Sequence, residues 1–281
     1  NKVQQDPPGA VNELKYSAAL TQRFRQSGNI NDLLSSDSLL LQVNNNFASI
    51  DLFFCLSLMY NAMMKHEFRA ADSFLSLAIA KGIRTHEAVA AGFDVDFELG
   101  RMAFAKARLQ KMKNPLDYNY KFREAKWLHY EGTIEAAITS MKEAAALAGN
   151  NITLLQAALS NTADLYLHSK DADSAFVYYQ KSLSLNKPDL HSLTGIGRIA
   201  LLHDKDSKLA DKIFRFVQVH TSSPDILLKL SQVAEMTGDS AKQLALSQKF
   251  QSVLSQNRYG NMYNKNLIIL YTSTLNNAPA A

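Results

Sequence analysis

The seven histidines are the residues of this sequence best suited to bind a metal ion or transfer a proton. They are His66, His86, His129, His168, His191, His203 and His220. A metal site on a helix needs two ligands three or four residues apart, and no two histidines have that spacing. Two histidines do precede an aspartate by three residues, in the pairs His168–Asp171 and His203–Asp206. Both pairs lie at predicted turns, where polar residues cap helices, so we expect no bound metal.

The remaining reactive residues give no pattern typical of an active site. The sequence lacks His-Glu-x-x-His, Gly-x-Ser-x-Gly, Gly-x-x-x-x-Gly-Lys and Gly-x-Gly-x-x-Gly. The single cysteine, Cys55, lies in an apolar run and is expected to be a small core residue. Asp94, Asp96 and Glu98 cluster before Gly100, and on a repeat helix we expect such carboxylates to be solvated. We therefore predict that the protein is not an enzyme and binds no cofactor.

A basic segment lies between residues 101 and 126. It contains eight basic residues: Arg101, Lys106, Arg108, Lys111, Lys113, Lys121, Arg123 and Lys126. Tyr118, Tyr120 and Phe122 are interleaved with them, and a basic, aromatic strip can bind acidic peptides, polysaccharide or nucleic acid. The alternative, which we favour, is an ordinary solvated helix face whose aromatic residues pack in the core. The chain as a whole has a formal net charge of only +4, so nucleic acid is not an expected partner.

The composition favours long helices. The chain has 281 residues, 47% of them apolar, with only 11 glycines and 6 prolines, which are few for the turns of a sheet-rich protein. The most apolar segment, residues 50–64, is shorter than the roughly 18–20 residues that span a bilayer and contains polar residues. We expect it to be a buried helix, and we expect no integral membrane segment.

A repeat of about 34 residues organises these helices. Its predicted turns lie near His66, Gly100, Gly132, Lys170, Lys205 and Gly238. Five residues after each turn come Ala71, Ala105, Ala137, Ala175, Ala210 and, as the exception, Gln243. Nine residues after the turn come Leu75, Leu109, Met141, Tyr179, Phe214 and Ser247. Two antiparallel helices approach most closely near their connection, so a methyl group is expected there and a bulkier side chain one turn later.

The pattern resembles the tetratricopeptide repeat (TPR) family over roughly residues 50–255. The unit from Leu159 to Pro188 matches best, and the Gly238 unit matches poorly. The unit ending near Lys205 carries a one-residue insertion, expected around residues 195–197. The resemblance implies an all-α fold: an α-solenoid, wound as a right-handed superhelix, of about six TPR-like helix hairpins.

The ends of the chain are expected to differ from the repeats. We predict a polar N-terminal tether at residues 1–15 and degenerate capping helices at residues 16–49. Residues 256–281 are predicted to form a C-terminal helix that either caps the stack or begins a further repeat. Because the sequence starts at Asn1 rather than Met and opens with a polar, Pro-rich segment, we favour an extracytoplasmic or cell-envelope location over a cytoplasmic one.

The resemblance also implies a function. In TPR proteins the first helix of each hairpin lines a concave groove that receives a peptide or partner protein. By register, the groove here would be lined by Tyr60, Met63, Asp94, Phe97, Phe122, Lys126, His129, Asp164, Leu167, Gln232 and Glu235. One TPR subfamily clamps the carboxylate end of chaperone tails, but of the corresponding positions here only Lys126 carries a suitable charge. We therefore predict a non-catalytic interaction scaffold; the alternative is a helical accessory or substrate-holding domain of a larger enzyme or envelope export assembly.

Overall fold

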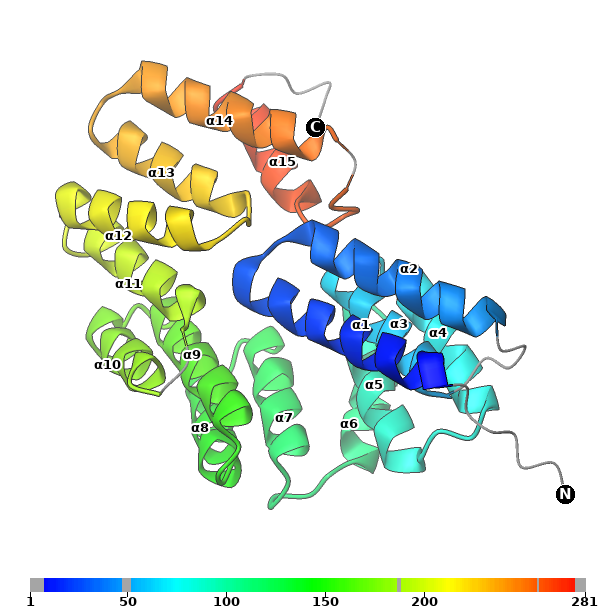
Figure 1. Ribbon diagram of the computed structural model, residues 1–281. Helices are drawn as coiled ribbons and strands as arrows, with labels where there is room; N and C mark the ends of the chain where they lie inside the picture. Colours follow the sequence, from blue (N-terminus) through cyan, green and yellow to red (C-terminus); the bar gives the residue numbers. More distant parts are fainter. Residues whose placement is uncertain (1–7, 47–51, 186–187, 257, 276–281) are drawn as a thin grey trace, which may run out of the picture. The chain divides into compact units, whose positions relative to one another are not determined.

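The computed structural model describes residues 8–46, 52–185, 188–256 and 258–275, and within these ranges the chain is helical without strands (Figure 1). It divides into two compact units, which are described separately. The first unit comprises residues 1–100, 221–224 and 251–281, and the second comprises residues 101–220 and 225–250. This division does not follow the boundaries at residues 50 and 255 expected from the sequence.

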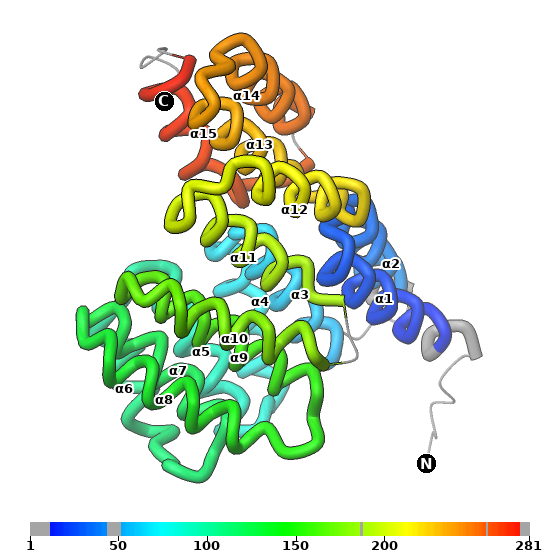
Figure 2. The backbone as a smooth tube through the Cα atoms, turned by 90° about the vertical axis from the view of Figure 1, so that its left-hand side faces the viewer, coloured from blue at the N-terminus to red at the C-terminus, as the bar shows by residue number. Residues whose placement is uncertain are grey.

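The helices of the first unit form two antiparallel hairpins and a following helix. Their bounds are α1 (Pro8–Ser27), α2 (Ile30–Asn46), α3 (Leu52–Met64), α4 (Phe68–Ala80), α5 (Thr85–Glu98) and, from the C-terminal region, α15 (Asn264–Thr272). Each helix from α1 to α5 packs on the next in sequence (Figure 2). Cys55 is buried in this unit beside Ala78 and Ile83, as a core residue.

The second unit is a stack of hairpins. Its helices are α6 (Met102–Lys111), α7 (Tyr118–Tyr130), α8 (Ile134–Leu147), α9 (Ile152–His168), α10 (Ala172–Leu183), α11 (Leu190–Leu202), α12 (Ser207–His220), α13 (Asp225–Met236) and most of α14 (Ser240–Leu254). From α6 to α13 every helix packs on its successor, which is the connectivity of a helical-repeat solenoid. None of the described helices of either unit is long and apolar enough to cross a bilayer.

The six predicted turns all adopt left-handed backbone conformations. Gly100, Gly132 and Gly238 have positive φ, as glycine allows at a helix C-terminus. The other three turns place a side chain in the same conformation, with φ of 57° at His66, 67° at Lys170 and 59° at Lys205. The earlier Gly28, between α1 and α2, has a φ of 69° and turns the first hairpin in the same way. The repeat period read from the sequence is therefore the period of the hairpins.

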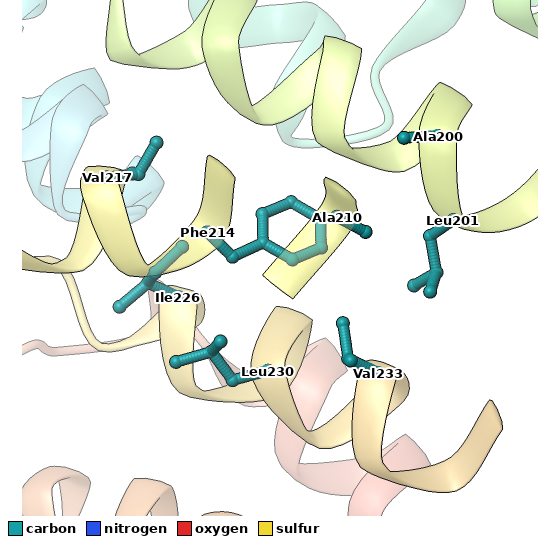
Figure 3. Close-up of a cluster of buried hydrophobic side chains, with 8 residues drawn as sticks. All are labelled: Ala200, Leu201, Ala210, Phe214, Val217, Ile226, Leu230 and Val233. Atoms are coloured by element: carbon teal, nitrogen blue, oxygen red, sulfur yellow. The ribbon is translucent and has the colours of Figure 1, made fainter. Parts of the chain in front are cut away.

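The small residues after the turns are core positions of the hairpins. Ala71, Ala105, Ala137, Ala175 and Ala210 are all completely buried. The larger residues one turn later are buried as well, with Tyr179 and Phe214 fully enclosed. In the α11–α12–α13 core, Ala210 and Phe214 lie among side chains of the two neighbouring helices (Figure 3). Gln243, the exception, is only partly buried, but Ser247 and Phe250 in the same repeat have no exposed surface.

The one-residue insertion lies in the turn and not at residues 195–197. In most hairpins the residue after the turn donates its N–H to a carbonyl five residues back, as Thr133 does to Leu128 and Asp171 does to Tyr166. At the Lys205 turn the corresponding bond spans six residues, from Asp206 to Ala200. The prediction was wrong because a turn tolerates an extra residue, whereas an insertion inside α11 would rotate its buried face.

Gly195 and Gly197 have a packing role instead. A Cβ atom at Gly195 would collide with the ring of Tyr179, and one at Gly197 with the ring of Phe214. These glycines on α11 therefore make room for the bulky residues of α10 and α12.

The N-terminal helix begins earlier than the tether boundary allows. Residues 8–15, assigned to a polar tether from the sequence, belong to α1, and residues 1–7 lie outside the described residues. Pro8 stands in the first turn, where its fixed φ suits a helix and its missing N–H costs nothing. Ser17, Leu20 and Phe24 are buried at helical spacing on α1. Ser17 contacts Ser36 of α2 through their hydroxyls, and Phe24 packs with Ile30 and Leu33.

The C-terminal region packs on the first hairpin. Tyr259 is buried in one cluster with Phe24, Ile30 and Leu33, and Met262 and Tyr263 pack at its border. The loop 221–224 joins the same unit, because the N–H of Ser222 donates to the carbonyl of Ser27 at 2.6 Å. Residues 258–275 therefore cover part of the α1–α2 hairpin, with α15 inside the region predicted to be the C-terminal helix.

Candidate functional site

A pocket between α7 and α9 in the second unit brings four of the predicted groove residues together. Its volume is about 340 Å³. The lining residues are Phe122, Ala125, Lys126, His129, Met141, Asn161, Asp164, Leu165 and His168. Phe122, Lys126, His129 and Asp164 are residues that the repeat register assigns to the groove, and here they line one pocket.

Helical spacing explains how α7 and α9 present these side chains. Phe122, Lys126 and His129 are four and three residues apart on α7, and Asn161, Asp164 and His168 have the same kind of spacing on α9. The fully buried Ala125 and Ala158 lie on the packed sides of the two helices. Each helix is fixed at its start by a side-chain cap, Asp117 on the N–H of Tyr120 and Asn151 on the N–H of Leu154.

Asp164 is the best-connected polar residue of the pocket. The hydroxyl of Tyr179 donates to its Oδ1 at 2.5 Å, and Nε2 of His191 lies 2.8 Å from its Oδ2. Burial disfavours the ionised form, but the bonds from His191 and Tyr179 outweigh it, so the pKa of Asp164 lies below its ordinary value. The hydrogen bond between His191 and Asp164 also raises the pKa of His191. Asp164 is therefore a carboxylate held by α10 and α11 as well as by its own helix.

His129 and His168 form a direct pair across the pocket. Nε2 of His129 and Nδ1 of His168 are 2.8 Å apart, and the two rings stack with centroids 4.7 Å apart. One nitrogen must donate a proton and the other must accept it, so the contact requires at least one neutral ring. Burial and the neighbouring His168 lower the pKa of His129, which favours its neutral form.

A second pocket continues along the other side of α9. It has a volume of about 260 Å³ and lies among α9, α10 and α11. Its lining residues are Leu167, Lys170, Ala172, Arg198, Ile199, Leu202 and His203. Leu167 is a fifth predicted groove residue, so the two pockets together follow the side of the second unit that the repeat register indicates.

The other predicted groove residues do not line these two pockets. Gln232 and Glu235 are exposed on α13. Tyr60, Met63, Asp94 and Phe97 belong to the first unit. There Met63 packs against a core cluster and Phe97 lies against the buried Phe93, whereas Tyr60 is 43% exposed.

The acidic cluster before Gly100 is not uniformly solvated. Asp96 is buried with 4% of its surface exposed, Asp94 is half-buried, and only Glu98 is exposed. The expectation of a solvated cluster was therefore wrong for Asp96, because α5 turns this residue toward the interior of the first unit.

The sequence analysis missed several residues of the site. The pockets are also lined by Asn161, His168, Lys170 and Arg198. The buried Tyr179 donates a hydrogen bond to Asp164. Asn161 and His168 could have been found, because they share the face of Asp164 on α9 at helical spacing. Tyr179 could not, because its position in the repeat predicts only a core residue.

The basic segment at residues 101–126 does not form one basic, aromatic surface. Tyr120 is buried, and Tyr118 and Phe122 stack with ring centroids 5.7 Å apart at the border of a core cluster. Lys121 pairs with Glu124 at 2.8 Å and Glu143 at 2.7 Å, and Lys106 lies 3.4 Å from Glu131. Tyr120 is therefore a core residue, as the favoured alternative predicted, whereas Phe122 lies at the border of the core and also lines the pocket.

The arrangement offers hydrogen bonds, charge and apolar surface to a ligand. Asp171 and Asp206, considered above as metal ligands, cap α10 and α12 by accepting the N–H groups of Ser174 and Leu209. Across the described ranges, no three histidine, cysteine, aspartate or glutamate side chains gather closely enough to hold a metal ion.

No protein-family model matches the sequence, and no curated protein matches it. Solved structures do match the fold. A TPR protein from Parabacteroides merdae is 10% identical with a TM-score of 0.55, covering 86% of this chain and 92% of its own. A thermophilic TPR protein from Thermus thermophilus is 17% identical with a TM-score of 0.54, covering 69% of this chain and 100% of its own.

PilF of Pseudomonas aeruginosa is also similar, at 15% identity and a TM-score of 0.52, covering 75% of this chain and 96% of its own. At such identities the likeness concerns the fold. It agrees with the left-handed turns, the buried alanines and the consecutive packing of helices described above. The chain is therefore an all-α helical-repeat protein with the tetratricopeptide-repeat fold.

Proposed function

We propose that the chain is a non-catalytic scaffold that binds an extended segment of a partner protein along the α7–α9–α11 side of the second unit. The observation that carries the proposal is the pair of adjoining pockets on either side of α9. Both combine apolar walls, such as Phe122 and Leu167, with polar side chains, and peptide-binding sites have this mixture.

The fixed geometry of the site supports the proposal. The bonds of Asp164 to Tyr179 and His191 lock its carboxylate in place before any ligand arrives. A preorganised site loses less conformational entropy on binding, so an extended peptide could bind with useful affinity. The role as an accessory domain of a larger enzyme or envelope export assembly would use the same surface, and the identity of the partner distinguishes the two.

The test is a selection of binding peptides from a random library on the full chain, followed by affinity measurements with variants. Asn161→Trp places a bulky ring in the α7–α9 pocket and should weaken the selected peptides by about tenfold or more, equivalent to about 1.4 kcal/mol. The control is Val219→Trp, on α12, where the wild-type side chain is 77% exposed. Equal effects of the two variants, or none from Asn161→Trp, would contradict binding at this site.

A further inference from the structure

The two pockets beside α9 have an excess of groups that carry or accept positive charge. Lys126, His129 and His168 line the first pocket, and Lys170, Arg198 and His203 line the second. In the second pocket His203 pairs with Asp204, with Nδ1 and Oδ1 2.8 Å apart, and the charge of Arg198 acts on Asp164. Asp164 is the one acidic residue among the lining side chains of both pockets. A ligand that follows them therefore meets a surface suited to negative charge.

Asp164 does little to cancel this charge, because its oxygens already have partners within the protein. Tyr179 donates to Oδ1, and His191 lies within hydrogen-bonding distance of Oδ2. The positive charge of Arg198 also stabilises the Asp164 carboxylate. A cationic ligand group would have to compete with these partners, whereas an anionic group would not.

The His129–His168 contact limits the protonation states that the first pocket can adopt. At a separation of 2.8 Å the two nitrogens share one proton, so full protonation of both rings would break the contact and place two cations side by side. A carboxylate beside the pair would offset that repulsion and accept the N–H that becomes available.

We propose that the α7–α9 pocket binds a carboxylate side chain of an acidic partner segment and that the His129–His168 pair takes up a proton from solvent when it does so. The carboxylate remains ionised, and the proton adds to a ring nitrogen to give an imidazolium that bonds to it. This inference rests on the proposed function and specifies its ligand. By linkage, affinity rises as the pH falls.

The charged groups around the pair come from several helices. Lys126 of α7 and Asp164 of α9 line the same pocket, and α8 contributes the uncharged Met141. His191 and Arg198 of α11 act on Asp164, and Lys170 follows α9 in the neighbouring pocket. Beyond the end of α7, Glu131 lies 3.4 Å from Lys106 of α6. The pH-dependent part of binding is assigned to the two histidines, because their contact must break when both rings are protonated.

The test uses two fluorescein-labelled peptides of about 12 residues, one of alternating glutamate and alanine and one with glutamine in place of glutamate. We expect the glutamate peptide to bind about tenfold more tightly at about pH 5.5 than at about pH 8, and the glutamine peptide to show no such change. Fluorescence anisotropy of the full chain measures both.

A double histidine variant separates the pair from general charge effects. His129→Gln combined with His168→Gln should abolish the pH dependence, because either ring on its own could still take up the proton. His86→Gln is the control: His86 lies in the first unit, its side chain is 75% exposed, and the change should leave both peptides unaffected. Persistence of the full pH dependence in the double variant would overturn the inference.

Other outcomes also decide the matter. Equal affinity for the two peptides would refute the carboxylate site but leave peptide binding, and thus the proposed function, intact. If neither peptide binds at any pH, the inference is refuted. The proposed function is then tested separately by the selection of binding peptides from the random library. A single-stranded oligonucleotide that binds as tightly as the glutamate peptide, with the same pH dependence, would show a general anion surface and overturn the specific site.

Discussion

The ring of Tyr179 occupies the space where a side chain at Gly195 would lie. Tyr179 is fully buried on α10, and Gly195 lies on α11 in the following hairpin. We predict that Gly195→Ala destabilises the protein by about 1–3 kcal/mol, because the added methyl group would collide with the Tyr179 ring unless the ring or the helices shift. Chemical denaturation measures the change in free energy of unfolding.

A double variant tests the cause of that loss. Tyr179→Leu removes the ring, so adding Gly195→Ala to it should cost much less than Gly195→Ala costs alone. Additive effects of the two changes would show that the ring and the glycine are not in contact.

Ala137→Leu should overpack the α7–α8 hairpin. Ala137 is completely buried, five residues after the Gly132 turn, and we expect a loss of about 1–3 kcal/mol. Ala136→Leu provides a matched control, since Ala136 is exposed one residue earlier on the same helix and the change should be close to neutral. Similar melting temperatures for the two variants would mean that the helix faces are assigned incorrectly.

The Asp164–His191 pair should make stability depend on pH in two directions. The raised pKa of His191 stabilises the fold below the ordinary histidine pKa of about 6.5, and this contribution disappears as the pH rises through the higher folded-state value. The lowered pKa of Asp164 contributes above about pH 4 and is lost as the pH falls through its folded-state value.

His191→Gln removes the first of these contributions. We expect the wild type to lose stability relative to the variant between about pH 6 and pH 8.5, measured as the urea midpoint at a series of pH values. His86→Gln, at an exposed position, should track the wild type. Parallel profiles for wild type and His191→Gln would contradict the ion pair.

Tyr259→Ala should loosen the first unit. Tyr259 is buried with Phe24, Ile30 and Leu33, so its truncation leaves a cavity and should cost about 3 kcal/mol. Amide hydrogen exchange in α1 and α2 should accelerate. Tyr16→Ala, at a 57% exposed position on α1, is the control, and equal exchange in both variants would show that the C-terminal segment does not hold the hairpin.

The sequence predicted the repeat well because its signals are local. A turn and a small residue five positions later fall within one hairpin. The spacing of Gly132 and Ala137 therefore predicts the hairpin without knowledge of distant contacts. The shared face of Lys126, His129 and Phe122 follows from helical spacing alone. Asp164, which the register assigns to the same groove from the adjacent hairpin, lines the same pocket.

Contacts between residues far apart in sequence escaped prediction. His129 and His168 are 39 residues apart, and their approach to 2.8 Å depends on how two hairpins stack. The hydrogen bond from Ser222 to Ser27 joins two segments that are far apart in the sequence, and the repeat pattern does not predict such a contact. The helical start of α1 was missed because Pro8 was taken as a sign of a tether, although proline also suits a first helical turn.

The left-handed conformation of Lys205 also provides a practical advantage for experiments. Glycine would adopt this φ of 59° without the strain of a side chain, so Lys205→Gly should increase stability by about 1 kcal/mol. The residue is not among the lining residues of either pocket, and its side chain donates a hydrogen bond to the carbonyl of Leu202. A more heat-resistant background of this kind would allow damaging pocket substitutions to be assayed in folded protein.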